Sequence, residues 1–341
     1  MTIIFRCNTN PEVGFGHLNR CRSLAQSLIQ KGEVCLMVGP DNFYKTKKDN
    51  NIFKEWMPIK KWNSGEEDSV NLIKIAKKNN ASYFVLDDYR IDEKYQMILL
   101  KAGYKWLQFY QKENKKPIWA DIIVNPMPGV TREDFKSVLR NKSSKLLLGQ
   151  NYAILRPEFA NVTKKTYFKK IKKVLLTFGG GDDKGANEFV LSTLLPVTPN
   201  YIKFLVISGF TNPNNNRLKE WILLNGSQRV DLLINPKDVA KLYSSCDIAV
   251  IAGGTTTYEI DCCGLPFLII STANNQIEQS KAWANTGKAK YLGDINSVNK
   301  HSLVTIFKSF LKVKQVSLED NSSTPYDGSY EVAKHIIANK Y

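Results

Sequence analysis

Short apolar runs alternate with stretches of helical period along the chain, and this alternation constrains the fold more than any other feature. Unbroken apolar runs of a few residues are typical of strands that are buried on both faces of a sheet. Between the runs, apolar residues recur at the 3.6-residue spacing of helices that bury one face. Strands that alternate with helices predict parallel sheets covered by helices on both faces, which is an α/β fold.

The pattern occurs twice. In the first half the predicted strands are Ile3–Cys7, Val34–Val38, Tyr83–Leu86, Trp106–Phe109 and Ile122–Val124, and the predicted helices are Leu18–Lys31, Val70–Lys78 and Glu93–Ala102. In the second half the strands are Val174–Phe178, Ile202–Ser208, Val230–Ile234, Ile248–Ile251 and Phe267–Ile270, and the helices are Ala186–Leu194, Arg217–Leu224, Asp238–Ser245, Tyr258–Cys263 and Gln276–Thr286. The polar stretch Asp41–Gly65 stays unassigned.

We therefore predict two doubly wound, Rossmann-like domains, residues 1–155 and 156–341, that face each other across a cleft. A length of 341 residues suits two domains of ordinary size. The sequence leaves open whether the final helix, near Tyr330–Asn339, packs back on the first domain. It says nothing of the oligomeric state.

The net charge of +16 could attract nucleic acid, an acidic membrane or a phosphorylated substrate. The lysines are scattered, however, and no basic segment is interleaved with aromatic residues, so we expect no nucleic-acid partner. No apolar run approaches the roughly 18 residues that a membrane span needs. The chain starts directly with a strand, and we expect a cytoplasmic protein. Six cysteines show no metal-ligand spacing, so we expect reduced core residues and no bound metal.

Two glycines and a histidine lie at the turn between the first strand and the first helix. Backbone N–H groups at a helix start are unpaired and suit an anion or a polar substrate group. Gly14 and Gly16 allow a ligand to approach the backbone closely. His17 supplies a titratable side chain. A tight turn with a surface histidine is the alternative interpretation.

Glycine-rich loops follow two strands of the second half. Gly179-Gly180-Gly181 resembles a turn that cradles a phosphate, although glycine clusters often only turn the chain. Ala252–Glu259 is more specific, because two glycines precede three threonines whose hydroxyls could bind a diphosphate. Glu259 could accept hydrogen bonds from a ribose diol. The alternative is a helix cap in which a threonine and Glu259 form a capping box.

Polar side chains follow other strands in the same way. Asn275 and Gln276 could recognise sugar hydroxyls or an acetamido group, because each amide offers a donor and an acceptor. Tyr89, after the strand that ends near Leu86, could orient a phosphate or a water. A structural turn explains each stretch equally well when it is taken alone. Their recurrence at strand ends in both halves favours a binding site.

Six motifs in order resemble those of a known family, the UDP-2,4-diacetamido-2,4,6-trideoxy-β-L-altropyranose hydrolases of pseudaminic acid biosynthesis. The matching stretches are Phe5-Arg6 with Val13–Arg20, Asp88-Tyr89, Leu148-Gly149 with Tyr152–Phe159, Phe178–Asp182, Ala252–Glu259 with Gly264-Leu265-Pro266, and Asn275-Gln276. The family belongs to the GT-B superfamily and is similar to the glycosyltransferase that makes lipid II.

The resemblance implies a GT-B fold in which the C-terminal domain holds UDP and the sugar faces the N-terminal domain. It implies that water attacks the anomeric carbon without a metal or cofactor. His17 matches the residue that activates or positions that water, Tyr89 matches a tyrosine near the same site, and Glu259 matches the acidic residue at the ribose. The residues that we predict to contact the substrate are Gly14, Gly16, Arg20, Arg156, Gly180, Gly254, Thr255, Thr256, Glu259, Asn275 and Gln276.

The predicted function is release of UDP from a UDP-diacetamido-trideoxyhexose. A GT-B glycosyltransferase that passes the sugar to an acceptor is the alternative, because fold does not fix function. A non-catalytic protein that binds nucleotide sugars or polyanions is a third reading, supported mainly by the charge. The chain departs from the family at Asn8 and at Leu107–Tyr110, on the sugar side, so the configuration and acyl groups of the sugar stay open.

Overall fold

The computed structural model describes residues 1–9, 15–59, 61–110, 115–165, 171–226, 228–312 and 327–339. The chain divides into two compact units. Unit 1 comprises residues 1–10, 16–156 and 326–341, and unit 2 comprises residues 11–15 and 157–325. Gly14 of the predicted site lies outside the described residues.

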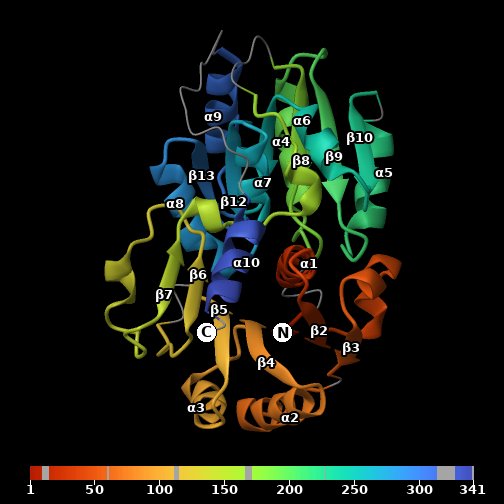
Figure 1. Cartoon of the computed structure of the whole chain (residues 1–341). Helices are drawn as coiled ribbons and strands as arrows, with labels where there is room; N and C mark the ends of the chain where they lie inside the picture. Colours follow the sequence, from red (N-terminus) through yellow and green to blue (C-terminus); the bar gives the residue numbers. More distant parts are fainter. Residues whose placement is uncertain are drawn as a thin grey trace. The chain divides into compact units, whose positions relative to one another are not determined.

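Unit 1 is built on a seven-stranded parallel sheet with the order β3-β2-β1-β4-β5-β6-β7 (Figure 1). Its strands are β1 (Thr2–Cys7), β2 (Val34–Gly39), β3 (Glu55–Pro58), β4 (Ala81–Asp87), β5 (Lys105–Phe109), β6 (Ile122–Asn125) and β7 (Lys145–Leu148). The order reverses direction at β1, which pairs with both β2 and β4. Ligands bind doubly wound sheets at such a switch point, beyond the carboxyl ends of the strands.

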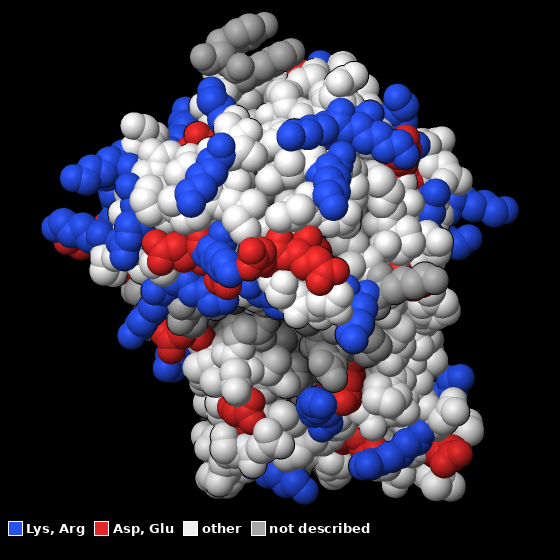
Figure 2. All heavy atoms as spheres, turned by 90° about the horizontal axis from the view of Figure 1, so that it is seen from below, with Lys and Arg blue, Asp and Glu red and all other residues white. Residues whose placement is uncertain are grey.

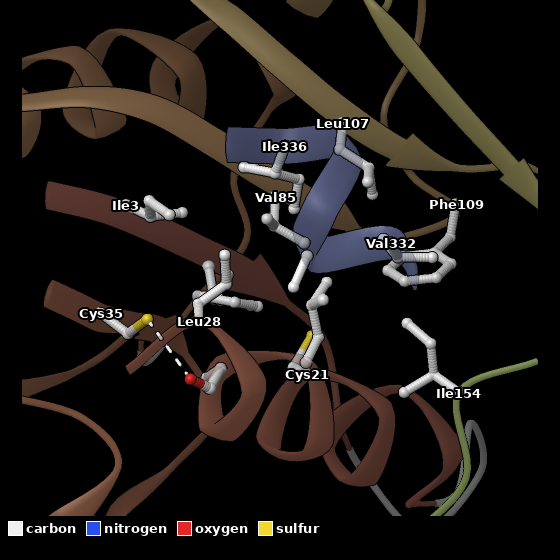
Figure 3. Close-up of a cluster of buried hydrophobic side chains, with 14 of the residues drawn as sticks. Ile3, Cys21, Leu28, Cys35, Val85, Leu107, Phe109, Ile154, Val332 and Ile336 are labelled. Atoms are coloured by element: carbon white, nitrogen blue, oxygen red, sulfur yellow. Dashed lines mark hydrogen bonds between the residues drawn. The ribbon is translucent and has the colours of Figure 1, made fainter. Parts of the chain in front are cut away.

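Helices cover both faces of this sheet. Neighbouring residues of β1 point to opposite faces, so Ile3 packs under α1 (Gly16–Ile29) and α10 (Gly328–Ala338), whereas Ile4 packs under α2 (Gly65–Lys78) and α3 (Glu93–Lys101). Figure 3 shows the first of these cores, in which Val332 and Ile336 of α10 meet Val85, Leu107 and Cys21. The final helix therefore belongs to unit 1.

Unit 2 repeats the plan with a six-stranded parallel sheet of order β10-β9-β8-β11-β12-β13. The strands are β8 (Lys173–Thr177), β9 (Lys203–Ser208), β10 (Val230–Ile234), β11 (Ile248–Ile251), β12 (Phe267–Ser271) and β13 (Ala289–Asp294). The helices are α4 (Ala186–Leu194), α5 (Asn215–Asn225), α6 (Val239–Ser244), α7 (Thr256–Cys262), α8 (Ile277–Asn285) and α9 (Lys300–Lys312). Residues of α4, α5 and α9 share one core with β8 and β12.

The α/β fold with two parallel sheets is confirmed, and the predicted strands and helices are all present. Three strands were not predicted, namely β3, β7 and β13, and each lies at an edge of its sheet. Each of these strands carries charged residues, which weaken the apolar signal. Helix α9 was also missed. None of the helices in the described ranges is long and apolar enough to cross a membrane.

Lysine and arginine side chains are scattered over the face of the molecule that Figure 2 shows. On this face, Lys and Arg side chains lie among uncharged residues and next to several Asp and Glu side chains.

Candidate active site

His17 lies in the first turn of α1, next to Gly16, where the chain enters the helix after β1. Leu18, Cys21 and Leu24 recur on the helix face that packs on the sheet, and they fix the helix against it. His17 is only 4% exposed, so it is not the surface histidine of the alternative interpretation.

Both predicted catalytic residues come together. The His17 ring meets the Tyr89 ring edge to face, with ring centroids 4.4 Å apart and an interplanar angle of 83°. Tyr89 follows the end of β4, the strand beside β1, and its carbonyl accepts a hydrogen bond from Lys116 Nζ at 3.0 Å. The carboxyl ends of adjacent parallel strands thus bring residues 17 and 89 to one place.

Asp87, the last residue of β4, is the partner that the sequence did not reveal. His17 Nδ1 lies 2.9 Å from the Asp87 backbone oxygen and 2.8 Å from Asp87 Oδ1. Arg20 Nε and Nη2 donate to the two carboxylate oxygens, each at 2.7 Å. The sequence places Asp87 at a strand end with Asp88 and Tyr89, but it does not show which of these side chains faces His17.

The electrostatics of this group favour an ionised carboxylate. Burial acts to raise the pKa of Asp87, but the charges and hydrogen bonds of Arg20 and His17 outweigh it and hold that pKa well below its ordinary value. The Arg20 guanidinium also stacks over the Phe109 ring, 4.4 Å from its centroid. Two Arg20 nitrogens are therefore engaged within unit 1, and the predicted contact of Arg20 with the substrate stays a prediction.

A second buried ion-pair network supports the same loop. Arg6 Nε and Nη2 donate to Asp68 at 2.9 and 3.0 Å, and Arg6 Nη1 lies 3.4 Å from Asp88 Oδ2. Asp88 in turn accepts two hydrogen bonds from the Arg90 side chain, at 2.9 and 2.6 Å. Tyr95 completes the network by donating to Asp68 at 3.0 Å. The network ties β1, α2 and α3 to the residues that flank Tyr89.

In unit 2, the loop from Gly253 to Thr257 follows β11 and leads into α7. A Cβ at Gly253 would overlap Ser280 Oγ and would lie 2.9 Å from the Gln276 carbonyl oxygen, so only glycine fits there. A Cβ at Gly254 would meet nothing within 4 Å. Thr255 is the residue before α7 but makes no capping hydrogen bond through its side chain. The capping-box alternative therefore does not explain Thr255.

Two glutamines brace this loop. Gln276 Oε1 accepts from the backbone N–H groups of Gly253 and Thr272, at 3.3 and 2.9 Å. Gln279 Nε2 donates to the carbonyl oxygens of Gly253 and Gly254, at 2.9 and 2.8 Å. Gln279 was not predicted, although it lies three residues after Gln276, a spacing that places two helical side chains side by side.

The remaining predicted residues are more scattered. Asn275 is exposed, Thr256 is partly buried in the first turn of α7, and Glu259 is 4% exposed within that helix. Gly180 follows β8, and its carbonyl accepts a hydrogen bond from Thr211 Oγ1 at 2.8 Å. Arg156 is partly buried at the last position of the 16–156 segment of unit 1. Their contacts with a substrate stay predictions, as does the cleft between the domains.

Within the described ranges, no three His, Cys, Asp or Glu side chains gather as a metal site would require. A hollow of about 440 Å³ lies between α4 and α5 of unit 2. Its charged lining is paired internally, since Arg217 donates to Glu188 at 2.7 Å and Lys184 Nζ lies 2.8 Å from Asp182 Oδ2. None of the predicted site residues lines it.

Solved structures of low sequence identity share this fold over nearly the whole chain. The Acinetobacter baumannii MurG structure superposes with a TM-score of 0.67 at 13% identity, covering 99% of this chain and 100% of that one. An S. aureus MnaA–UDP co-structure gives a TM-score of 0.63 at 14% identity, covering 99% and 96%. At such identities the likeness shows the fold alone.

Sequence relatives are closer. The spore coat polysaccharide biosynthesis protein SpsG of Bacillus subtilis is 26% identical over 288 residues, 83% of this chain and 80% of its own. The UDP-2,4-diacetamido-2,4,6-trideoxy-beta-L-altropyranose hydrolase of Campylobacter jejuni is 25% identical over 286 residues, 83% of this chain and 96% of its own. No family model matches the chain. The two-domain GT-B fold is confirmed, and so is the resemblance of this chain to the UDP-2,4-diacetamido-2,4,6-trideoxy-β-L-altropyranose hydrolases.

Proposed function

We propose that this protein hydrolyses a UDP-diacetamido-trideoxyhexose, releasing UDP and the free sugar for pseudaminic or related nonulosonic acid synthesis. A water oxygen forms a bond to the anomeric carbon while the bond from that carbon to the diphosphate oxygen breaks. The electron pair leaves with UDP, and the water proton passes to His17. The observation that carries the proposal is the buried His17 ring, held by Asp87 against Tyr89.

The chemistry needs a base more than it needs an acid. A diphosphate is a good leaving group, so stabilising its negative charge matters more than protonating it, and neutral N–H and O–H donors can do so. We assign that role to Gly254, Thr255 and Thr256 in unit 2. The Gly253 N–H already bonds to Gln276, so it contributes less to ligand binding.

We further propose that the reaction needs no metal ion and takes place in the cytoplasm. All six cysteines are free and buried, which suits a reducing compartment. Excess EDTA should leave the rate unchanged. A rate that falls in EDTA and returns with added Mg²⁺ would contradict the metal-free mechanism.

The direct test is incubation of the purified protein with UDP-2,4-diacetamido-2,4,6-trideoxyhexoses and no acceptor. We expect UDP and free sugar in equal amounts. In water enriched in oxygen-18, UDP should carry no label, because cleavage at the anomeric carbon leaves the diphosphate oxygen with UDP. Labelled UDP would place the attack at phosphorus, and no UDP release from any of these sugars would reject the hydrolase.

A glycosyltransferase would give a different result in the same assay. UDP release would then depend on an added acceptor. A protein that only binds polyanions would show salt-sensitive binding to nucleic acid and no measurable affinity for UDP.

A further inference from the structure

The contacts of His17 define where its proton must be. His17 Nδ1 lies 2.9 Å from the Asp87 backbone oxygen, and a carbonyl oxygen can only accept a hydrogen bond. The second neighbour of Nδ1, Asp87 Oδ1 at 2.8 Å, belongs to a carboxylate that Arg20 keeps ionised and that therefore also only accepts. Two acceptors facing one nitrogen require that this nitrogen carries the hydrogen.

The second ring nitrogen then follows by elimination. A neutral imidazole has one N–H and one lone pair. Because Nδ1 holds the hydrogen, Nε2 holds the lone pair. Nε2 is thus the atom that can take a proton from water.

We propose that Asp87 is a positioning residue that holds neutral His17 in the Nδ1–H tautomer and so makes Nε2 the base. The proposal rests on the hydrolase function proposed above. Asp87 acts through His17.

Four further contacts keep this arrangement rigid. The two hydrogen bonds from Arg20, both 2.7 Å, fix the rotation of the Asp87 carboxylate. The Phe109 ring lies under the Arg20 guanidinium. The Tyr89 ring packs against the His17 imidazole, with ring centroids 4.4 Å apart. The group formed by Asp87, Arg20 and neutral His17 has no net charge, and it carries one positive charge once Nε2 has taken a proton.

The tautomer can be measured without any substrate. Side-chain ¹⁵N NMR of the neutral histidines distinguishes a protonated from an unprotonated ring nitrogen, and a His17→Gln variant assigns the His17 signals among the three histidines of the chain. We expect a protonated Nδ1 and an unprotonated Nε2. A His17 ring with the hydrogen on Nε2, or an even mixture of tautomers, would overturn the proposal.

Kinetics test the consequence. Asp87→Asn should lower kcat by about 10²- to 10⁴-fold, the range for loss of a correctly held base, and change KM by less than about twofold. Asp88→Asn is the matched control, because Asp88 pairs with Arg6 and Arg90, and it should keep the His17 tautomer. If Asp87→Asn folds and turns over like the wild type, Asp87 does not position the base.

The two proposals can fail separately. An Nδ1–H signal in a protein that hydrolyses no UDP-sugar would reject the function and leave the hold of Asp87 on His17 intact. Turnover with the opposite tautomer would reject the role of Asp87 and leave the function intact.

Discussion

The two candidate regions are built with different chemistry. In unit 1, His17 is surrounded by buried charges, since Asp87 pairs with Arg20 and Asp88 pairs with Arg6 and Arg90. In unit 2, the Gly253–Thr257 loop is held by neutral groups, the amides of Gln276 and Gln279 and a glycine that leaves no room for a Cβ. Both regions lie where parallel strands end.

The difference matches the task proposed for each region. A base that takes up a proton needs nearby charge to fix its orientation and to balance the charge that it gains. A loop that binds a diphosphate needs unpaired N–H and O–H donors, and a carboxylate that faced the phosphates would repel them. Buried charges are costly when one partner is removed, whereas neutral hydrogen bonds are worth about 0.5–1.5 kcal/mol each. Substitutions in the two regions should therefore fail in different ways.

The largest effect is expected at His17. His17→Gln should reduce kcat by about 10²- to 10⁴-fold, because the base is lost, while UDP affinity stays unchanged. Steady-state kinetics and calorimetric titration with UDP measure the two quantities. His301→Gln, at an exposed position in α9, serves as the control and should behave like the wild type. Wild-type turnover of His17→Gln would remove His17 from the mechanism.

The next largest effect is expected on the free energy of unfolding, when the buried ion pair of Arg6 with Asp68 is broken. Arg6→Met leaves Asp68 and Asp88 without their partner in a site where the Arg6 side chain is 1% exposed, and should lower the free energy of unfolding by about 3–5 kcal/mol. The control is Arg217→Met in unit 2, where the arginine is 67% exposed and water screens its pair with Glu188, so we expect little change in stability. Urea unfolding compares the two. If both variants lost the same free energy of unfolding, burial would not determine how much an ion pair contributes to stability.

The two neighbouring glycines of the unit 2 loop should separate stability from binding. Gly253→Ala must displace Ser280 and should cost about 1–3 kcal/mol of folding free energy, as overpacking does. Gly254→Ala meets no protein atom and should leave stability unchanged, but its methyl group should weaken UDP binding if the ligand approaches the backbone there. Thermal unfolding and titration with UDP give the two readouts. If Gly254→Ala lost stability and Gly253→Ala only weakened UDP binding, the two glycines would have the opposite roles.

The last prediction concerns how the stability that Asp87 contributes depends on pH. Its pKa in the folded protein lies below the ordinary value of 3.8, so its contribution to stability is present above that value and is lost as the pH falls below it. Between neutral pH and strongly acidic solution, the unfolding free energy of the wild type should therefore fall more than that of Asp87→Asn. If the unfolding free energies of the two proteins changed with pH in parallel, the pKa of Asp87 would not differ between the folded and unfolded states.

The sequence predicts the interior of both sheets well and their edges poorly. Phe267–Ile270 is buried on both sides, so its apolar run is unbroken. Ile3–Cys7 is also buried on both sides, and only the buried Arg6 interrupts its apolar run. The edge strand Glu55–Pro58 mixes exposed and partly buried positions and ends in proline, so nothing in it distinguishes a strand from a loop. Helix α9 is different, because its buried residues Leu303 and Phe307 are four positions apart, a spacing that does predict a helix.

The candidate site shows the same division. His17 and Tyr89 were predicted because each follows a strand, and strand ends converge in a parallel sheet. Asp87 and Gln279 were missed because their roles depend on the direction of a side chain toward a distant residue. That direction is set by packing, which local sequence does not encode.

The return of α10 to unit 1 has a consequence for synthesis of the protein on the ribosome. Val332, Ala333 and Ile336 complete a core whose other members come from the first half of the chain. Residues 157–325, which are nearly all of unit 2, are translated between these two parts, which takes on the order of 10 s at roughly 5–20 residues per second. During that interval the face of the unit 1 sheet that α10 covers waits without its last helix. The unit that is translated second therefore has its full sequence available first.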